Sequence, residues 1–316
     1  MKVGYAFSSE DHPPATLVAH AREAEEHGFE FGLVSDHYHP WIDAQGHSPF
    51  VWTTIGAILA STSRLRIGTG VTCPLMRIHP AIVAQAAATC AALAPGRFFL
   101  GVGSGENLNE HVLGDRWPGA GERLEMTEEA IDVMRQLWEG GVVNHRGRHY
   151  TVEDARLYTL PEQPVELVLA AGKPNAAELA GRVADGLVNT SPDKEVVQAF
   201  ERGGGKGKPR YGMLHVCVHE DEAEARRLAH ELWPNIALGG ELSREIKNPE
   251  DFQSAVEPIT EDAVAEVVPC GNDPQKHLEQ IERFADVGFD HVWVHQIGED
   301  QTAFFRFYRD EVLPTL

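Results

Sequence analysis

The chain has 316 residues, 42% of them hydrophobic, and a formal net charge of -21 at pH 7. A chain of this length can bury a large core, and it is long for a single domain, which favours a barrel. The negative charge argues against nucleic acids and anionic membrane surfaces as partners, because their phosphate groups would repel the protein.

Strand-loop-helix units follow one another with short connections through the first half of the chain. The predicted strands are short runs, each too apolar to be half exposed, so parallel strands covered by helices are expected. The first helix shows Leu17, Ala21 and Ala24 at helical spacing and ends at the C-capping Gly28. Strands are expected at residues 2–7, 31–34, 65–71 and 97–103, with helices at 15–27 and 81–93 and another that carries Ile55, Ile58 and Leu59.

The second half adds a hairpin, further helices and four more strands. Between residues 222 and 271 lies an acidic, mostly helical insertion, which is a candidate lid or partner surface. Eight strand-helix units predict a (β/α)8 TIM barrel, a single domain over residues 1–316 that carries this insertion. A doubly wound open sheet is the alternative, disfavoured because no Gly-x-Gly-x-x-Gly follows the first strand. The further elements are expected at 122–138 and 273–287 (helices), 144–158 (hairpin), 166–171, 186–190, 211–218 and 291–295 (strands), before a closing helix to Leu313.

Acid–base side chains follow several predicted strands directly. The first strand is followed by Glu10, the second by Asp36 and His37, and the fourth by Glu106 and Asn109. The carboxyl ends of barrel strands form one mouth, so these side chains are expected to gather there. An imidazole among carboxylates is what proton transfer requires, since neighbouring groups push their pKa values apart.

The four cysteines are scattered along the chain, without a Cys-x-x-Cys pair. A disulfide framework or a zinc knuckle is therefore not expected, and a reducing cytosol fits best. The sequence opens on a strand rather than on a charged and then apolar leader, and no apolar run approaches about 18 residues. These features predict a soluble, cytoplasmic protein. The cysteines are Cys73, Cys90, Cys217 and Cys270.

Four segments together resemble the luciferase-like superfamily of barrel enzymes. Within it they are most similar to the deazaflavin (coenzyme F420)-dependent oxidoreductases typified by glucose-6-phosphate dehydrogenase, over nearly the whole chain. The resemblance implies an F420-binding barrel, often a homodimer, that passes a hydride between a substrate carbinol carbon and C5 of the deazaflavin. The segments are Val34-Ser35-Asp36-His37 with Trp41, Gly68-Thr69-Gly70-Val71, Gly101-Val102-Gly103-Ser104-Gly105-Glu106-Asn107-Leu108-Asn109, and Leu169-Ala170-Ala171-Gly172.

The resemblance also implies roles for individual residues. His37 is expected to be the general base that takes the hydroxyl proton, and Glu106 to handle the proton at the N1 side of the deazaflavin. Trp41 is expected to form one wall of the substrate site, and Glu10 to be a second acidic group at the substrate. The bond between Gly70 and the next residue is expected to be a non-prolyl cis peptide behind the ring. Cofactor contacts are expected from Asp36, Gly70, Val71, Ser104, Gly105, Asn109, Ala170, Ala171, Gly172 and Lys173.

The chain departs from the sugar-phosphate members of the family in its expected phosphate pocket. Where those members place a lysine after the sixth strand, this chain has Asp193, and the other basic positions fall on Ser243 and Val267. Asp193 would repel a phosphate dianion. The sequence therefore predicts an uncharged alcohol or sugar as substrate, or a differently seated phosphate, and an inefficient glucose-6-phosphate dehydrogenase. The expected substrate-binding residues are Thr190, Ser191, Lys194 and Arg244.

Some of the same residues are compatible with other functions. An FMN-dependent monooxygenase of the same superfamily is the first alternative, with FMN as cofactor in place of F420, and a carrier without catalysis is the least favoured. A barrel metallohydrolase is suggested by His37-Tyr38-His39 and by later histidines, including His215 and His295. It is disfavoured because Asp290 precedes its strand instead of following it, so no metal is expected. The histidines of the last strand are interpreted as packing or as facing the outer helices, and the glycine-rich segment 203–208 as a flexible linker.

Overall fold

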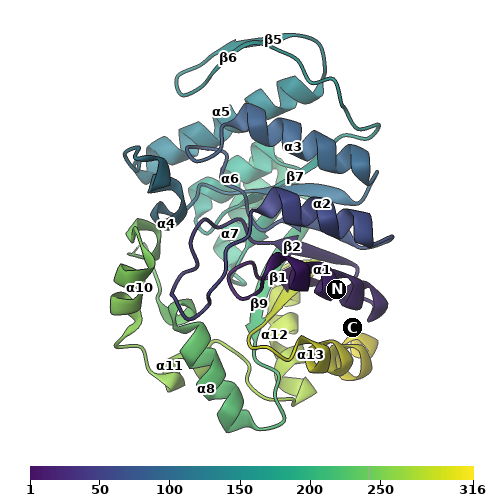
Figure 1. Ribbon diagram of the computed structural model, residues 1–316, viewed down its shortest axis with the longest axis vertical. Coiled ribbons are helices and arrows are strands. Elements are labelled where there is room, and N and C mark those ends of the chain that lie inside the picture. Colours follow the sequence, from purple (N-terminus) through teal and green to yellow (C-terminus); the bar gives the residue numbers. More distant parts are fainter. Residues whose placement is uncertain (241) are drawn as a thin grey trace.

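Eight parallel strands close into a barrel in the computed structural model, which describes residues 1–240 and 242–316. Around the barrel the order is β1-β10-β9-β8-β7-β4-β3-β2, so β1 pairs with both β2 and β10. The predicted (β/α)8 barrel is confirmed (Figure 1). The strands are β1 Lys2–Phe7, β2 Phe31–Val34, β3 Arg66–Thr69, β4 Phe98–Val102, β7 Glu166–Ala170, β8 Gly186–Asn189, β9 Arg210–Val216 and β10 His291–Gln296.

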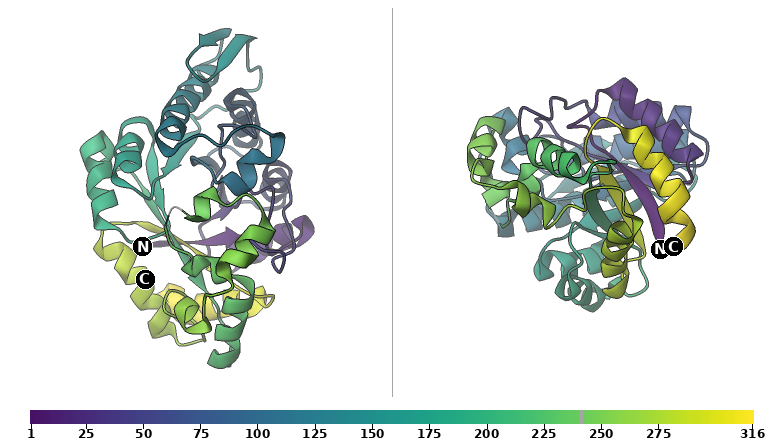
Figure 2. Two further views of the ribbon diagram at one scale, coloured as in Figure 1. Left: turned by 90° about the vertical axis from the view of Figure 1, so that its left-hand side faces the viewer. Right: turned by 90° about the horizontal axis from the view of Figure 1, so that it is seen from below.

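Helices follow the barrel strands and cover the barrel from outside. Four of them start with a proline in the first turn, where its fixed φ suits a helix and its missing N–H costs nothing. The two chain ends lie close together beside α1 and α13 (Figures 1 and 2). The outer helices are α1 Pro14–Glu26, α2 Val51–Ser61, α3 Pro80–Leu93, α5 Ala120–Trp138, α6 Pro174–Val183, α7 Lys194–Phe200, α12 Pro274–Asp286 and α13 Gln301–Phe307, and short helical turns are η1 His111–Leu113, η2 Glu201–Gly205, η3 Pro234–Ala237, η4 Tyr308–Val312 and η5 Leu313–Thr315.

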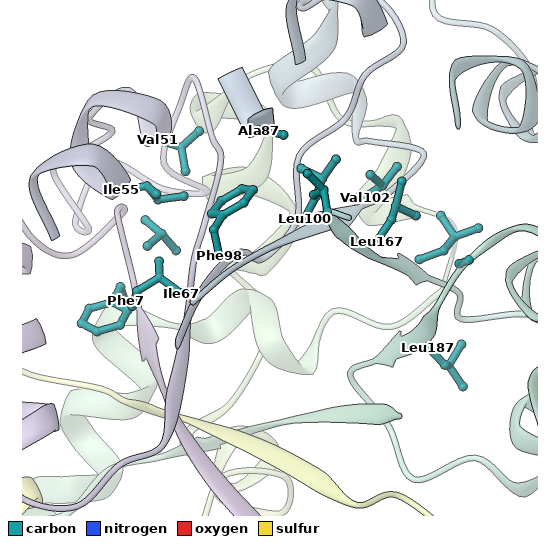
Figure 3. Close-up of a cluster of buried hydrophobic side chains, with 14 of the residues drawn as sticks. Phe7, Val51, Ile55, Ile67, Ala87, Phe98, Leu100, Val102, Leu167 and Leu187 are labelled. Carbon is teal, nitrogen blue, oxygen red and sulfur yellow. The ribbon is translucent and has the colours of Figure 1, made fainter. Parts of the chain in front are cut away.

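Side chains alternate between two buried layers along each strand, as the pleat requires. One layer fills the barrel interior and includes Leu33, Phe99 and Trp293. The other lies between the strands and the helices, and Figure 3 shows part of it, with Ile67 and Phe98 of the strands near Ile55 of α2. Both layers close the barrel below its mouth, so polar groups are left for the carboxyl ends of the strands.

The segment from 203 to 208 packs closely against α6 at Gly203, where its interpretation as a flexible linker is wrong. A Cβ on Gly203 would lie 2.1 Å from the carbonyl oxygen of Glu178 in α6. A Cβ on Gly181 of α6 would likewise lie 2.2 Å from the carbonyl oxygen of Phe200. Glycines therefore allow α6 and the chain after α7 to meet backbone to backbone, a close approach that the composition of the segment does not reveal.

Two excursions leave the barrel. The hairpin predicted at 144–158 is confirmed as β5 Val143–Arg146 and β6 Thr151–Ala155, which pair antiparallel at one end of the molecule beyond α5 (Figure 1). The insertion predicted at 222–271 is helical, and it lies on the same side of the barrel as the short α4 Asn107–Glu110 (Figures 1 and 2). Its helices are α8 Glu222–Leu232, α9 Leu242–Glu245, α10 Pro249–Val256 and α11 Glu261–Ala265.

Within the two described ranges, no helix combines the length and the apolar character needed to cross a membrane.

Candidate active site

A carboxylate and an imidazole meet where the neighbouring strands β1 and β2 end. Glu10 is buried, and its Oε2 accepts hydrogen bonds from the hydroxyls of Ser8 at 3.0 Å and Ser35 at 2.6 Å. Its other oxygen lies 3.2 Å from His37 Nδ1, within ion-pair distance although outside hydrogen-bond geometry. Since a carboxylate only accepts, this placement favours the proton on Nδ1 and leaves the lone pair of Nε2 available as a base.

The position of Glu10 changes its expected role. The sequence predicted an acidic group that faces the substrate, whereas the side chain of Glu10 is 3% exposed and lies behind the imidazole of His37. Two serine hydroxyls hold its carboxylate in place, one from the end of each strand. Glu10 can therefore orient and polarise His37, in the way that a buried carboxylate orients a catalytic histidine.

Trp41 stands between His37 and the helical insertion. Its ring centroid lies 4.9 Å from that of His37 and 5.1 Å from that of Phe252 in α10, both in edge-to-face contact. The side chain of Gln45 accepts a hydrogen bond from the Trp41 amide and donates one to the carbonyl of Leu232. The insertion thus packs on the loop after β2 and closes one wall of the mouth.

The short helix α4 brings Glu106 to the same loop. Asn109 Oδ1 accepts hydrogen bonds from the amides of Tyr38 at 2.8 Å and His39 at 3.2 Å, directly after His37. Glu106 precedes the first residue of α4 and is partly exposed, and its carboxylate has no hydrogen bond or ion pair to any residue of the described chain. A carboxylate that the protein leaves unpartnered, three residues from a contact with the His37 loop, is available to a ligand.

Both carboxylate oxygens of Asp36 accept hydrogen bonds from neighbouring side chains. Arg77 Nη2 donates to Oδ1 at 2.8 Å, and the hydroxyl of Thr72 donates to Oδ2 at 2.7 Å. Arg77 also pairs with the buried Glu110, so one guanidinium bridges the loop after β2 and α4. Burial raises the pKa of Glu110 above its ordinary value, and Arg77 opposes that shift. The contact of Asp36 with a cofactor remains a prediction.

A flat shelf of backbone lies beside these groups at the ends of β3 and β4. The peptide between Gly70 and Val71 is cis, as the family resemblance implied. Gly105 has φ +71°, and a Cβ there would lie 2.6 Å from Cys73 Sγ. A Cβ on Gly103 would lie 2.6 Å from the side chain of Val71. The two loops can approach each other this closely only with glycine at these positions.

Two cations flank the N-terminus of α6, after Ala170 and Ala171 of the β7 end. Lys173 is the exposed N-cap residue, and Arg244 of α9 places Nη2 3.2 Å from the point where a Cβ on Gly172 would stand. Neither cation makes an ion pair with any residue in the described ranges. Positive side chains at a helix N-terminus suit an anion. Arg244, expected at the substrate, thus lies beside the segment expected to hold the cofactor.

The remaining expected substrate residues lie at the end of β8. The side chains of Thr190, Ser191 and Lys194 are exposed. Asp193 is the N-cap of α7, where its Oδ1 accepts from the amides of Glu195 at 2.8 Å and the following residue at 3.3 Å.

A second imidazole cluster lies at the mouth, where His215 and His295, expected only as possible metal ligands, meet Asp11, a residue that the sequence did not single out. His295 packs as expected and is 1% exposed, but it faces the mouth rather than the outer helices, and its Nε2 lies 2.9 Å from Asp11 Oδ2 after β1. Its Nδ1 lies 2.9 Å from Nδ1 of His215 on β9, and Asp11 also accepts from the indole of Trp233. The alternation of side chains along β10 indicates this placement. Trp293 fills the barrel interior, and residue 295, two positions later, lies on the same face of the strand.

No three or more His, Cys, Asp or Glu side chains form a group that could hold a metal ion in the part of the chain that the structure describes.

Comparisons with known proteins agree with this architecture. A family model described as "Luciferase-like monooxygenase" matches residues 1–291. F420-dependent glucose-6-phosphate dehydrogenases from Microbacterium testaceum and Beutenbergia cavernae are each 37% identical to this chain, covering 100% of it and 97% of the relative. A solved F420-dependent secondary alcohol dehydrogenase, in complex with an F420-acetone adduct, superposes with a TM-score of 0.93 at 30% identity, covering 100% of this chain and 99% of that one.

Proposed function

This chain belongs to the luciferase-like monooxygenase family, and from that premise we propose that it is an F420-dependent oxidoreductase that transfers a hydride between an alcohol or sugar and C5 of the deazaflavin. The relatives that name F420 as their cofactor are 37% and 30% identical to this chain over its whole length, which supports F420 over FMN. The observation that carries the proposal is the buried Glu10–His37 pair at the barrel mouth, beside the shelf formed by the Gly70–Val71 cis peptide.

The residues at the mouth fit F420. Asn109 Nδ2 is buried and has no hydrogen-bond partner among the described residues, so it can donate to a ring carbonyl. Gly70, Gly103 and Gly105 contribute no side chains to the shelf, so a flat ring can approach their backbone. Lys173 and Arg244 can bind the phosphate and the acidic tail.

The protein supplies the proton transfers and the orientation. When bound, F420 supplies the carbon that accepts or returns the hydride. His37 Nε2 takes the proton of the substrate hydroxyl, and Glu10 stabilises the imidazolium that forms. Glu106 holds a proton at the N1 side of the deazaflavin, and Trp41 confines the substrate against the imidazole. Asp36 and Arg77 fix the loop on which His37 stands.

Binding of the two candidate cofactors tests the proposal. Purified apoprotein is expected to bind F420 and to reduce it when a secondary alcohol or a sugar is added, which is followed by loss of the deazaflavin absorbance. FMN is expected to bind more weakly and to support no turnover with dioxygen. Tighter binding of FMN, with consumption of dioxygen, would contradict the proposal and favour the monooxygenase alternative.

We propose further that glucose-6-phosphate is a poor substrate, because Asp193 stands where a phosphate would be held. Asp193→Lys is expected to raise kcat/KM for glucose-6-phosphate about 3- to 10-fold by replacing repulsion with attraction. The change also removes the N-cap of α7, which costs about 1 kcal/mol. Asp193→Asn is the matched control, since asparagine keeps the cap and removes only the charge. If neither variant gains sugar-phosphate turnover in a steady-state assay, the repulsion argument is wrong.

We also propose that the enzyme works as a homodimer in the cytosol. The four cysteines are free and buried, which suits a reducing compartment.

A further inference from the structure

A chain of hydrogen bonds crosses the mouth beside the Glu10–His37 pair. Asp11 directly follows Glu10, so consecutive carboxylates at the end of β1 each face one imidazole, His37 on the β2 side and His295 on the β10 side. His295 in turn contacts His215 on the next strand, β9, and the register pairs these two residues directly. Asp11 is therefore connected through His295 to His215, an imidazole that the proposed mechanism does not use.

The direction of these hydrogen bonds follows from Asp11. A carboxylate only accepts, and Asp11 accepts from Trp233 Nε1 at 2.9 and 3.0 Å, so His295 Nε2, at 2.9 Å from Oδ2, carries a proton. In the neutral form of His295 the lone pair then lies on Nδ1. The proton between the two Nδ1 atoms, 2.9 Å apart, therefore belongs to His215. In neutral His215 this leaves Nε2 as an unprotonated acceptor.

Burial keeps His215 neutral, since it holds the pKa of this imidazole well below the ordinary value for histidine. His215 is partly exposed, whereas His295 is 1% exposed. His215 shares the inward face of β9 with Tyr211 and Met213, which belong to the barrel interior. No residue of the described chain makes a hydrogen bond to its Nε2. The acceptor thus lies at the mouth and lacks a protein partner.

We infer that His215 Nε2 accepts a hydrogen bond from a second hydroxyl of the substrate, so that the substrate class is an uncharged diol, polyol or sugar rather than a simple alcohol or a sugar phosphate. This inference rests on the proposed function, because it places the reacting hydroxyl at His37. The strands β2, β1, β10 and β9 are consecutive in the closed eight-stranded barrel, so His37 and His215 lie three strands apart around the same mouth, with Glu10, Asp11 and His295 between them.

The same network disfavours an anion at this position. A phosphate dianion has no proton to give to His215 Nε2, and the carboxylates of Glu10 and Asp11 lie next to the site. Hydroxyl groups satisfy a lone pair without adding charge. Aromatic walls are present as well, because Trp233 contacts the rings of both His215 and His295.

Paired substrates test this inference. The ratio of kcat/KM for sorbitol or glucose to that for 2-propanol is measured with F420 for the unmodified enzyme and for His215→Leu. The ratio is expected to fall about 10- to 100-fold in His215→Leu, which corresponds to loss of one buried hydrogen bond. His215→Gln, whose carbonyl can still accept, is expected to recover part of it. His219→Leu, beyond the end of β9, is the matched control and keeps the ratio.

Nitrogen NMR of histidine-labelled apoprotein gives a readout that does not depend on turnover. The Nε2 signal of His215, assigned by its loss in His215→Leu, is expected at the position of an unprotonated nitrogen. Asp11→Asn should reverse this protonation pattern. Trp233 Nε1 should still donate to the side-chain oxygen at position 11, so the new amide NH2 faces His295 and donates to its Nε2. His295 then donates from Nδ1, and His215 Nε2 becomes protonated.

The outcomes separate this inference from the proposed function. F420-linked turnover with an unchanged substrate ratio in His215→Leu, or a protonated Nε2 in the unmodified apoprotein, would overturn the role of His215 and leave the oxidoreductase assignment intact. Absence of F420 binding, with the expected NMR tautomer present, would instead remove the proposed function.

Discussion

Replacing His37 by alanine is expected to lower kcat about 100- to 10,000-fold, the usual range for loss of a positioned general base. The hydroxyl proton must leave as the hydride does, and His37 is the imidazole that Glu10 orients at the mouth. Affinity for F420 should change little, because the contacts proposed for the cofactor are the backbone shelf and the cations near α6. Stopped-flow reduction of F420, with cofactor affinity measured separately, checks both expectations.

Three comparisons make the role of His37 specific. Added imidazole should restore part of the activity of His37→Ala, because the small base can enter the vacated space. Glu10→Gln should lose less activity than His37→Ala and shift the pH profile, since it orients the base without accepting the proton. His27→Ala, at the end of α1 and remote from the mouth, should behave like the unmodified enzyme. If His37→Ala kept more than about a tenth of the activity, another group would have to be the base.

The barrel was predictable from the sequence because two kinds of sequence pattern indicate its strands, one in the strand itself and one in the helix that follows. Each is a short apolar run, and several are followed by a helix that starts at a proline or ends at a glycine, as at Pro80 and Gly28. The connection after β8 was not read correctly. Gly203 looks like a flexible-linker residue in isolation, and only its close approach to Glu178 of α6 explains why a side chain is excluded there.

The site was predictable to the extent that chemistry follows strand ends. His37 and Glu106 were predicted in this way, and the structure places their loops in contact through Asn109. The cluster around His295 was missed because its partner, Asp11, is separated from it by 284 positions in the sequence. No local pattern reports such a pairing. The burial of Glu10 was missed for a related reason, since it depends on hydroxyls from two strands.

Arg77→Met is expected to destabilise the fold by about 3–5 kcal/mol, because it leaves two buried carboxylates without their shared cation. The side chain of Arg77 is 7% exposed, and those of Asp36 and Glu110 are each 1% exposed. Methionine fills much of the volume, so the effect reports the lost charge more than a cavity. Denaturant unfolding measures the change. Arg116→Met, which removes an ion pair whose arginine is 74% exposed, is the matched control and should cost no more than about 1 kcal/mol.

The charge argument for Arg77 can be separated from packing by a second change and by pH. Glu110→Gln added to Arg77→Met should recover part of the lost stability, since it removes one of the two stranded charges. Burial already raises the pKa of Glu110, and loss of Arg77 raises it further. A carboxyl whose folded pKa lies above its unfolded value destabilises the protein at higher pH, and protonation relieves this as the pH falls toward the folded pKa. The stability deficit of Arg77→Met should therefore shrink on mild acidification, and a deficit independent of pH would show that Arg77 acts through packing instead.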